Sequence, residues 1–234
     1  MSEITLINTE EKIVIFTGAL FFWFGLWGLA ALLPLRKYKL SRYQENDLRN
    51  RVVSFIHGFM GLVFSAYQEA MYDREYGGQN SDYENALLTF SLAYFFYDVV
   101  AMAYYAQDGI GRIFFNSLGM FIHHAILILG FGTSVVHNVS AAELVSCFFI
   151  SEISNPPMHL RTILKQLNLR FTQLWETCEM SYLCMLSFIV VLYILARCGA
   201  GPKVMYNTFV YSPSWVIKGL GALLLAQSFF YAIK

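Results

Sequence analysis

Hydrophobic runs long enough to cross a lipid bilayer recur along the whole chain, and they restrict what it can fold into. In lipid, every backbone N–H and C=O group must bond within the protein, and a helix needs about 20 residues to cross the hydrocarbon core. Seven runs approach or exceed this length: 13–35, 52–71, 86–106, 113–131, 139–164, 180–196 and 215–233. We therefore predict an all-α fold, a polytopic membrane helix bundle of about seven spans.

The composition supports a membrane protein without a separate soluble domain. Only 14% of the 234 residues are charged and 57% are hydrophobic, whereas a soluble domain carries about 25% charged residues. We expect residues 1–48 to hold an N-terminal tail, the first span and a basic loop, and residues 49–234 to form one membrane domain. The net charge is zero, which gives no reason to expect a nucleic-acid partner.

The loop charges predict an orientation. Basic residues follow the first, third and fifth runs, and the densest group lies at positions 36–51, whereas the loop at 72–85 is acidic. The positive-inside rule then places the N-terminus outside and the C-terminus on the cytoplasmic or matrix side. We expect no cleaved presequence, because the polar start lacks the pattern of a signal or transit peptide. The endoplasmic reticulum and the mitochondrial inner membrane both remain open.

Several polar side chains interrupt the hydrophobic runs. A carboxylate at the centre of a membrane helix costs about 2.5–3.5 kcal/mol unless it is paired or neutral, so such residues need partners on other helices. We expect them to form one polar centre inside the bundle. The candidates are His57, Tyr94, Asp98, His123, His124, Glu152 and Asn155.

Asp98 and one of the two adjacent histidines could form a proton-transfer pair, because a carboxylate orients an imidazole and raises its basicity. The alternative is a hydrogen bond that only fixes the register of two helices. His123 and His124 point about 100° apart on a helix, so we expect one to face the centre and the other a neighbouring helix. Adjacent histidines are also poorly placed to bind one metal, and we expect neither a metal nor another cofactor.

Three motifs together resemble those of the TLC-domain family. They are Tyr94-Phe95-Phe96-Tyr97-Asp98, the pair His123-His124, and Ser151-Glu152-Ile153-Ser154-Asn155-Pro156-Pro157 followed by Leu160-Arg161. The family includes ceramide synthases and translocating-chain-associating membrane proteins, and the resemblance covers about residues 49–232. It implies a TLC-like helical barrel with a lipid-accessible cavity, in which the histidine pair and Asp98 face inward.

In ceramide synthases, the histidine pair acts in transferring an acyl chain from coenzyme A to a sphingoid amine. Here apolar residues 125–131 stand where those enzymes carry polar residues of the Lag motif. The chain is more similar to short TLC-domain-containing proteins associated with membrane lipid composition. Whether it is an enzyme stays open at this stage; a coenzyme A thioester would be a substrate if it transferred acyl groups.

Two interpretations follow. In the first, the protein binds or modifies a membrane lipid: His124 is the general base, Asp98 orients it, and His123 is a further catalytic candidate. His57, Tyr94, Glu152 and Asn155 would bind the substrate. In the second, the chain is a non-catalytic accessory subunit of a larger membrane complex, such as an organelle inner-membrane assembly, and uses the same scaffold for packing and for lipid binding.

Overall fold

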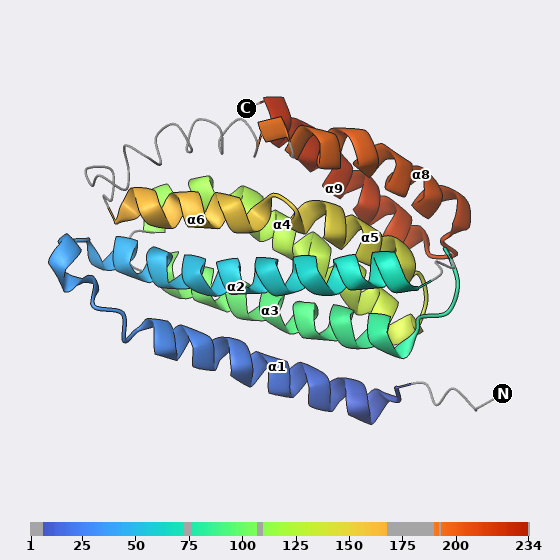
Figure 1. Cartoon of the computed structure of the whole chain (residues 1–234), viewed down its shortest axis with the longest axis horizontal. Coiled ribbons are helices and arrows are strands. Elements are labelled where there is room, and N and C mark those ends of the chain that lie inside the picture. The colour runs from blue at the N-terminus through green and yellow to red at the C-terminus, as the bar shows by residue number, and fades with distance from the viewer. Residues whose placement is uncertain (1–6, 73–75, 107–109, 168–189, 192, 234) are drawn as a thin grey trace.

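The computed structural model shows long helices lying side by side along one common direction (Figure 1). It describes residues 7–72, 76–106, 110–167, 190–191 and 193–233. Within these ranges the chain is helical apart from short connections, and its one β feature is an isolated bridge between Gln79 and Val139. The predicted all-α membrane bundle is therefore confirmed.

The helices follow the hydrophobic runs closely. They are α1 (Thr9–Ala30), α2 (Arg42–Met71), α3 (Asp82–Ala106), α4 (Ile110–His137), α5 (Ala141–Glu152), α6 (Asn155–Gln166), α8 (Gly201–Tyr211) and α9 (Trp215–Ile233). A short 3₁₀ turn, Leu35–Tyr38, separates α1 from α2, and a π-helical segment, Ile194–Ala200, leads directly into α8. Among the described helices, three are long and apolar enough to cross a membrane, namely Thr9–Ala30, Asp82–Tyr104 and Leu118–His137.

The fifth hydrophobic run forms two helices of 12 residues each. α5 ends at Glu152 and α6 begins at Asn155, so the break lies just before two successive prolines. Pro156 and Pro157 occupy the first turn of α6. Proline is tolerated there because the first N–H groups of a helix have no intrahelical partner.

The predicted end of the sixth run, at residue 196, is wrong. The helix continues through Ile194–Ala200 and α8 as far as Tyr211, although residues 168–189 lie outside the described part. The sequence from Gly199 to Pro202 is typical of a helix end. The structure accommodates it because the wider π-helical turns come directly before Pro202, which then falls in the first turn of α8.

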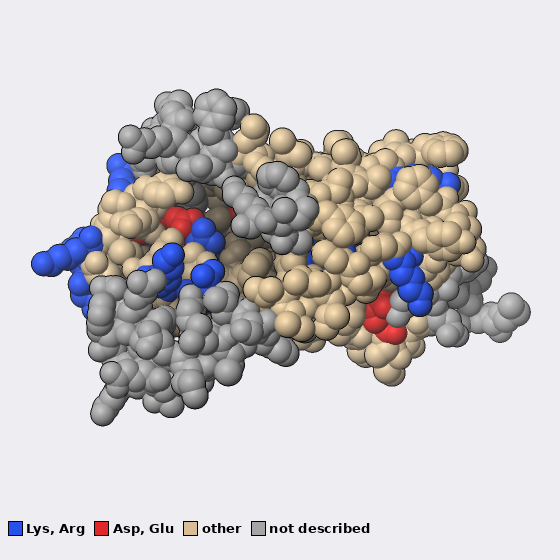
Figure 2. All heavy atoms as spheres, turned by 90° about the horizontal axis from the view of Figure 1, so that it is seen from above, with Lys and Arg blue, Asp and Glu red and all other residues tan. Residues whose placement is uncertain are grey.

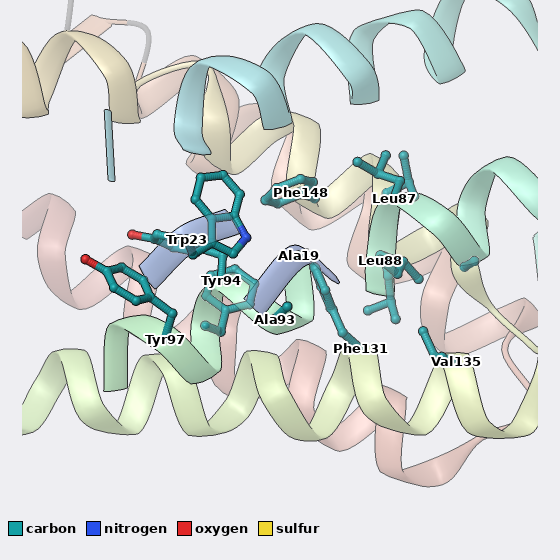
Figure 3. Packing of buried hydrophobic residues seen from close by; sticks show 14 of the residues in the cluster. Ala19, Trp23, Leu87, Leu88, Ala93, Tyr94, Tyr97, Phe131, Val135 and Phe148 are labelled. Carbon is teal, nitrogen blue, oxygen red and sulfur yellow. The ribbon is translucent and has the colours of Figure 1, made fainter. Parts of the chain in front are cut away.

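Trp23 anchors α1 to the rest of the bundle. Its side chain is fully buried, and α1 packs mainly on α3. The indole ring meets the rings of His57 and Tyr94 edge to face, with centroids 5.5 and 5.4 Å apart. Figure 3 shows Trp23 beside Tyr94 and Tyr97, with Phe148 close by. The core therefore ties α1, α2, α3 and α5 together around one aromatic cluster.

Small residues let α2 approach α5 closely. A Cβ atom on Gly61 would lie 2.6 Å from the Cζ atom of Phe148, and one on Gly58 would lie 2.9 Å from Oε2 of Glu152. Real side chains do not approach so closely. These two glycines therefore set the distance between the helices.

Hydrogen bonds join the loops at the end of the bundle that carries the acidic loop. The Asn80 amide donates to the carbonyl of Ser134 and to the side chain of Asn85, at 3.0 and 3.1 Å. Its oxygen accepts from the backbone N–H of Ala141 at 2.9 Å. Lys and Arg gather at the opposite end, where α2 begins (Figure 2). A few Lys and Arg side chains also lie at the other end, and acidic side chains are visible at both ends.

Candidate functional site

Asp98 on α3 and His124 on α4 form a buried pair in the bundle interior. Nδ1 of His124 lies 3.2 Å from Oδ2 of Asp98, although the contact is too bent to count as a regular hydrogen bond. Both residues are 4% exposed. From the helix ends at the acidic loop, Asp98 is 16 residues along α3 and His124 is 13 residues along α4. At 1.5 Å per residue, the pair lies about 20–24 Å inside the bundle.

Asn50 on α2 holds the carboxylate of this pair. Its amide nitrogen donates to Oδ1 of Asp98 at 2.5 Å, and its amide oxygen accepts from the hydroxyl of Tyr97 at 2.8 Å. We did not predict Asn50, because it lies in the basic stretch before the second hydrophobic run. A signal was present, since Asn50, Ser54 and His57 recur at the i, i+4, i+7 spacing of one helix face.

His57 and Tyr94 stack on each other next to the pair. Their rings are 3.6 Å apart and nearly parallel, and the Tyr94 hydroxyl donates to Oγ of Ser54 at 2.9 Å. His57 is 2% exposed, and its Nε2 atom has no hydrogen-bond partner. Phe95 lies between the two histidines, with its ring centroid 5.5 Å from those of both His57 and His124. His57 is therefore packed among aromatic rings.

His123 faces a different helix from His124. Its Nδ1 atom lies 3.1 Å from the side-chain oxygen of Gln227 on α9, and the Gln227 amide donates to the carbonyl of Gly119 at 3.0 Å. The two neighbouring imidazoles thus serve two interfaces, in the way that their angular separation on the helix predicted. The structure does not bring His123 to Asp98.

Glu152 and Asn155 form a third polar group at the junction of α5 and α6. The Asn155 amide donates to Oε2 of Glu152 at 3.1 Å, and Glu152 is 4% exposed. Its carboxylate is directed toward Gly58 of α2. Within the described residues, no hydrogen bond connects this group to Asp98. The expected single polar centre is therefore divided into three neighbouring groups.

The orientation of His124 determines what chemistry the pair can perform. With Nδ1 toward the carboxylate, the other ring nitrogen, Nε2, is the one left to receive a proton, and it makes no hydrogen bond in the described part of the chain. A carboxylate on the far side of the ring fixes the tautomer and stabilises the imidazolium that then forms. The pair has the form of a general base and its orienting group. Among the described residues, no three His, Cys, Asp or Glu side chains gather in a metal-binding arrangement.

Comparison with protein families supports the resemblance seen in the sequence. The family model described as TLC domain matches residues 47–232, which include every helix from α2 to α9 apart from the first residues of α2 and the last residue of α9. No solved structure matches this chain. The matched region contains all the candidate residues described above.

Proposed function

Because the chain belongs to the TLC-domain family, we propose that it is a multi-pass membrane protein that binds or modifies a lipid at the Asp98–His124 pair. The observation that carries this proposal is the 3.2 Å approach of Nδ1 to a carboxylate that Asn50 also binds. A buried charge or imidazole inside a membrane bundle is expensive, and such residues mark functional sites by default.

In the proposed reaction, Nε2 of His124 accepts a proton from a hydroxyl or amine of the lipid, and Asp98 stabilises the resulting imidazolium. The Asn50 amide keeps the carboxylate in place, and the Tyr97 hydroxyl in turn holds the amide. If the reaction is acyl transfer, a coenzyme A thioester supplies the acyl group. If there is no reaction, the same groups bind the polar end of the lipid.

The site is closed in this conformation, since both members of the pair are only 4% exposed. A lipid therefore reaches His124 only after neighbouring helices separate. The surrounding side chains are mainly aromatic and aliphatic, which suits an acyl chain entering from the bilayer.

Replacing His124 tests the proposal, and His123 offers a matched control on the same helix. We expect His124→Gln to lose lipid turnover or specific lipid binding while the protein still folds, because glutamine cannot act as a base. His123→Gln should retain most of the function, since its partner is Gln227. Lipids bound to each variant can be identified by mass spectrometry after gentle extraction from the native membrane. Unchanged lipid handling by His124→Gln would contradict the proposal.

The closed network also supports a second candidate function, that of a non-catalytic subunit of a larger membrane complex. Asn50 contacts one oxygen of Asp98 and His124 lies against the other. This arrangement is expected of polar contacts that fix the positions of α2, α3 and α4 relative to one another. Stoichiometric protein partners in the same mass-spectrometry experiment, without a defined lipid, would favour this function. The partners would also identify the membrane, for which the endoplasmic reticulum and the mitochondrial inner membrane are the two candidates.

A further inference from the structure

Arg197 is a partly buried arginine well away from the acidic-loop end of the bundle. It lies in the π-helical segment Ile194–Ala200, and the helix extends a further 14 residues to Tyr211 at the acidic-loop end. At 1.5 Å per residue, this places Arg197 about 21 Å from that end, at a depth similar to that of His124.

The guanidinium group makes contacts only with neutral groups. Nη2 donates to the carbonyl of Ser151 at 3.2 Å and Nη1 to the hydroxyl of Ser228 at 3.3 Å, while the group lies 5.3 Å from the centre of the Tyr193 ring. The Nε atom is buried and has no hydrogen-bond partner. Among the described residues, no carboxylate oxygen lies within 4.0 Å of Arg197. Within the described part of the chain, the cation therefore has hydrogen bonds but no ion pair.

The adjacent carboxylate of Glu152 is within electrostatic range of Arg197 but forms no ion pair with it. Although Glu152 follows Ser151 directly in the chain, its side chain accepts from Asn155 and is directed toward Gly58 on α2. Arg197 contacts the other side of α5, where it faces α9 through Ser228. The two charges thus belong to different interfaces of α5.

Arg197 lines a cavity between α5, the π-helical segment, α8 and α9. The space within it that can hold water-sized groups is about 50 Å³, and a single water requires about 10–15 Å³ on this measure. The polar groups of Arg197, Ser151 and Ser228 share the cavity with apolar side chains, among them Leu144, Val204 and Leu224. Glu143 also lines the cavity, but it lies eight residues before Ser151 on α5, about 12 Å away along the helix, so the positive end of the cavity is the end at Arg197. A cation beside an apolar wall is complementary to an amphiphile with a negative end.

We propose that this cavity binds the anionic head group, a carboxylate or a phosphate, of a single-chain lipid. Arg197 supplies the charge and the unused Nε donor, and the Ser228 hydroxyl, which donates to the carbonyl of Leu224 in this structure, rotates to donate to the head group instead. The acyl chain lies along the apolar wall of the cavity toward the bilayer. The site uses different residues from the Asp98–His124 pair, which lies on α3 and α4, and it does not depend on the function proposed for that pair.

The test compares three lipids with the same chain on the full protein in nanodiscs: oleate, oleoyl lysophosphatidate and the neutral oleyl alcohol. Displacement of a fluorescent fatty acid measures binding. The matched variants are Arg197→Gln, which removes the charge, Arg197→Lys, which retains it without the planar fork, and Arg36→Gln, which removes an exposed arginine elsewhere. His124→Gln should bind the anionic lipids like wild type, so a failure of this site can be distinguished from a failure of the other.

We expect at least one anionic lipid to bind wild type and Arg36→Gln equally, and to bind Arg197→Gln more weakly by a factor of roughly 10 to 100. Preference for oleate would identify the ligand as a fatty acid, and preference for lysophosphatidate would identify it as a phospholipid. Binding by Arg197→Gln within twofold of wild type would overturn the proposal.

If that variant fails to fold, the wild-type protein provides the test by itself. Oleyl alcohol that displaces the fluorescent fatty acid as well as both anionic lipids do would then overturn the proposal. Val204→Phe, which narrows the cavity, should weaken binding with the charge intact.

Discussion

Replacing Gly61 by alanine should push α2 and α5 apart. The new Cβ atom would lie 2.6 Å from Cζ of Phe148, whereas carbon atoms in contact are ordinarily 3.5–4.0 Å apart. Phe148 must therefore move by about 1 Å. It has little freedom to do so, since it is 3% exposed and packs against the rings of Phe131 and His57, both at 5.7 Å.

The size of the effect follows from two opposing contributions. Overfilling a packed interior costs about 1–3 kcal/mol, and alanine in place of glycine within a helix returns up to about 1 kcal/mol. We expect Gly61→Ala to lower the free energy of unfolding by about 1–2 kcal/mol. The matched control is Gly25→Ala on α1, where a Cβ atom meets nothing within 4 Å; this variant should be as stable as wild type or slightly more stable.

Unfolding of purified protein in a fixed detergent, followed by tryptophan fluorescence, measures both changes. Shortening the opposing side chain should reverse the clash, so Gly61→Ala combined with Phe148→Leu should be more stable than the sum of the two single changes predicts. The reasoning fails if Gly61→Ala is as stable as Gly25→Ala. It also fails if the two changes are simply additive.

Two further changes test the aromatic and polar parts of the core. Asn50→Leu removes the hydrogen bonds to Asp98 and Tyr97. From the values measured for hydrogen bonds between membrane helices, we expect the free energy of unfolding to fall by about 1–3 kcal/mol in the same assay. A loss below about 0.5 kcal/mol would show that neither bond contributes to stability. Trp23→Ala removes the fully buried anchor of α1 and should cost about 3–5 kcal/mol. Hydrogen exchange should then quicken in α1 while α4 keeps its protection, and equal exchange in both would contradict the assigned role of Trp23.

Most of the fold could be predicted because membrane helices can be recognised in a sequence by their length and hydrophobicity. The run at 215–233 coincides with α9. The prediction failed where hydrophobicity was not the deciding factor. Glycine and proline near residue 200 are typical of a helix end. A π-helical segment directly before Pro202 instead accommodates them, and the helix continues to Tyr211.

The site could be predicted only in part, because sequence shows which residues are costly to bury but not which partners offset that cost. Asp98 and His124 stood out as polar residues inside apolar runs. Asn50 did not, because it lies among charged residues at the start of α2. Arg197 was missed for a related reason, since the predicted end of the sixth run left it outside the membrane. Which imidazole faces which helix depends on the rotation of α4 about its axis. In the structure His124 lies against Asp98 and His123 lies against Gln227.

The side chain of Asn80 joins the beginnings of α3 and α5 to the end of α4. Helices fastened at one end behave as levers, so any opening that admits a lipid is small near Asn80 and grows with distance from it. The Asp98–His124 pair lies about 20–24 Å from that fastening, and a tilt of about 10° there separates neighbouring helices by about 4 Å. A tilt of about 10°, with no helix unfolding, would therefore open a gap beside a site that is closed at rest. Distances between spin labels at the two ends of α3 and α4 would show whether the ends move unequally.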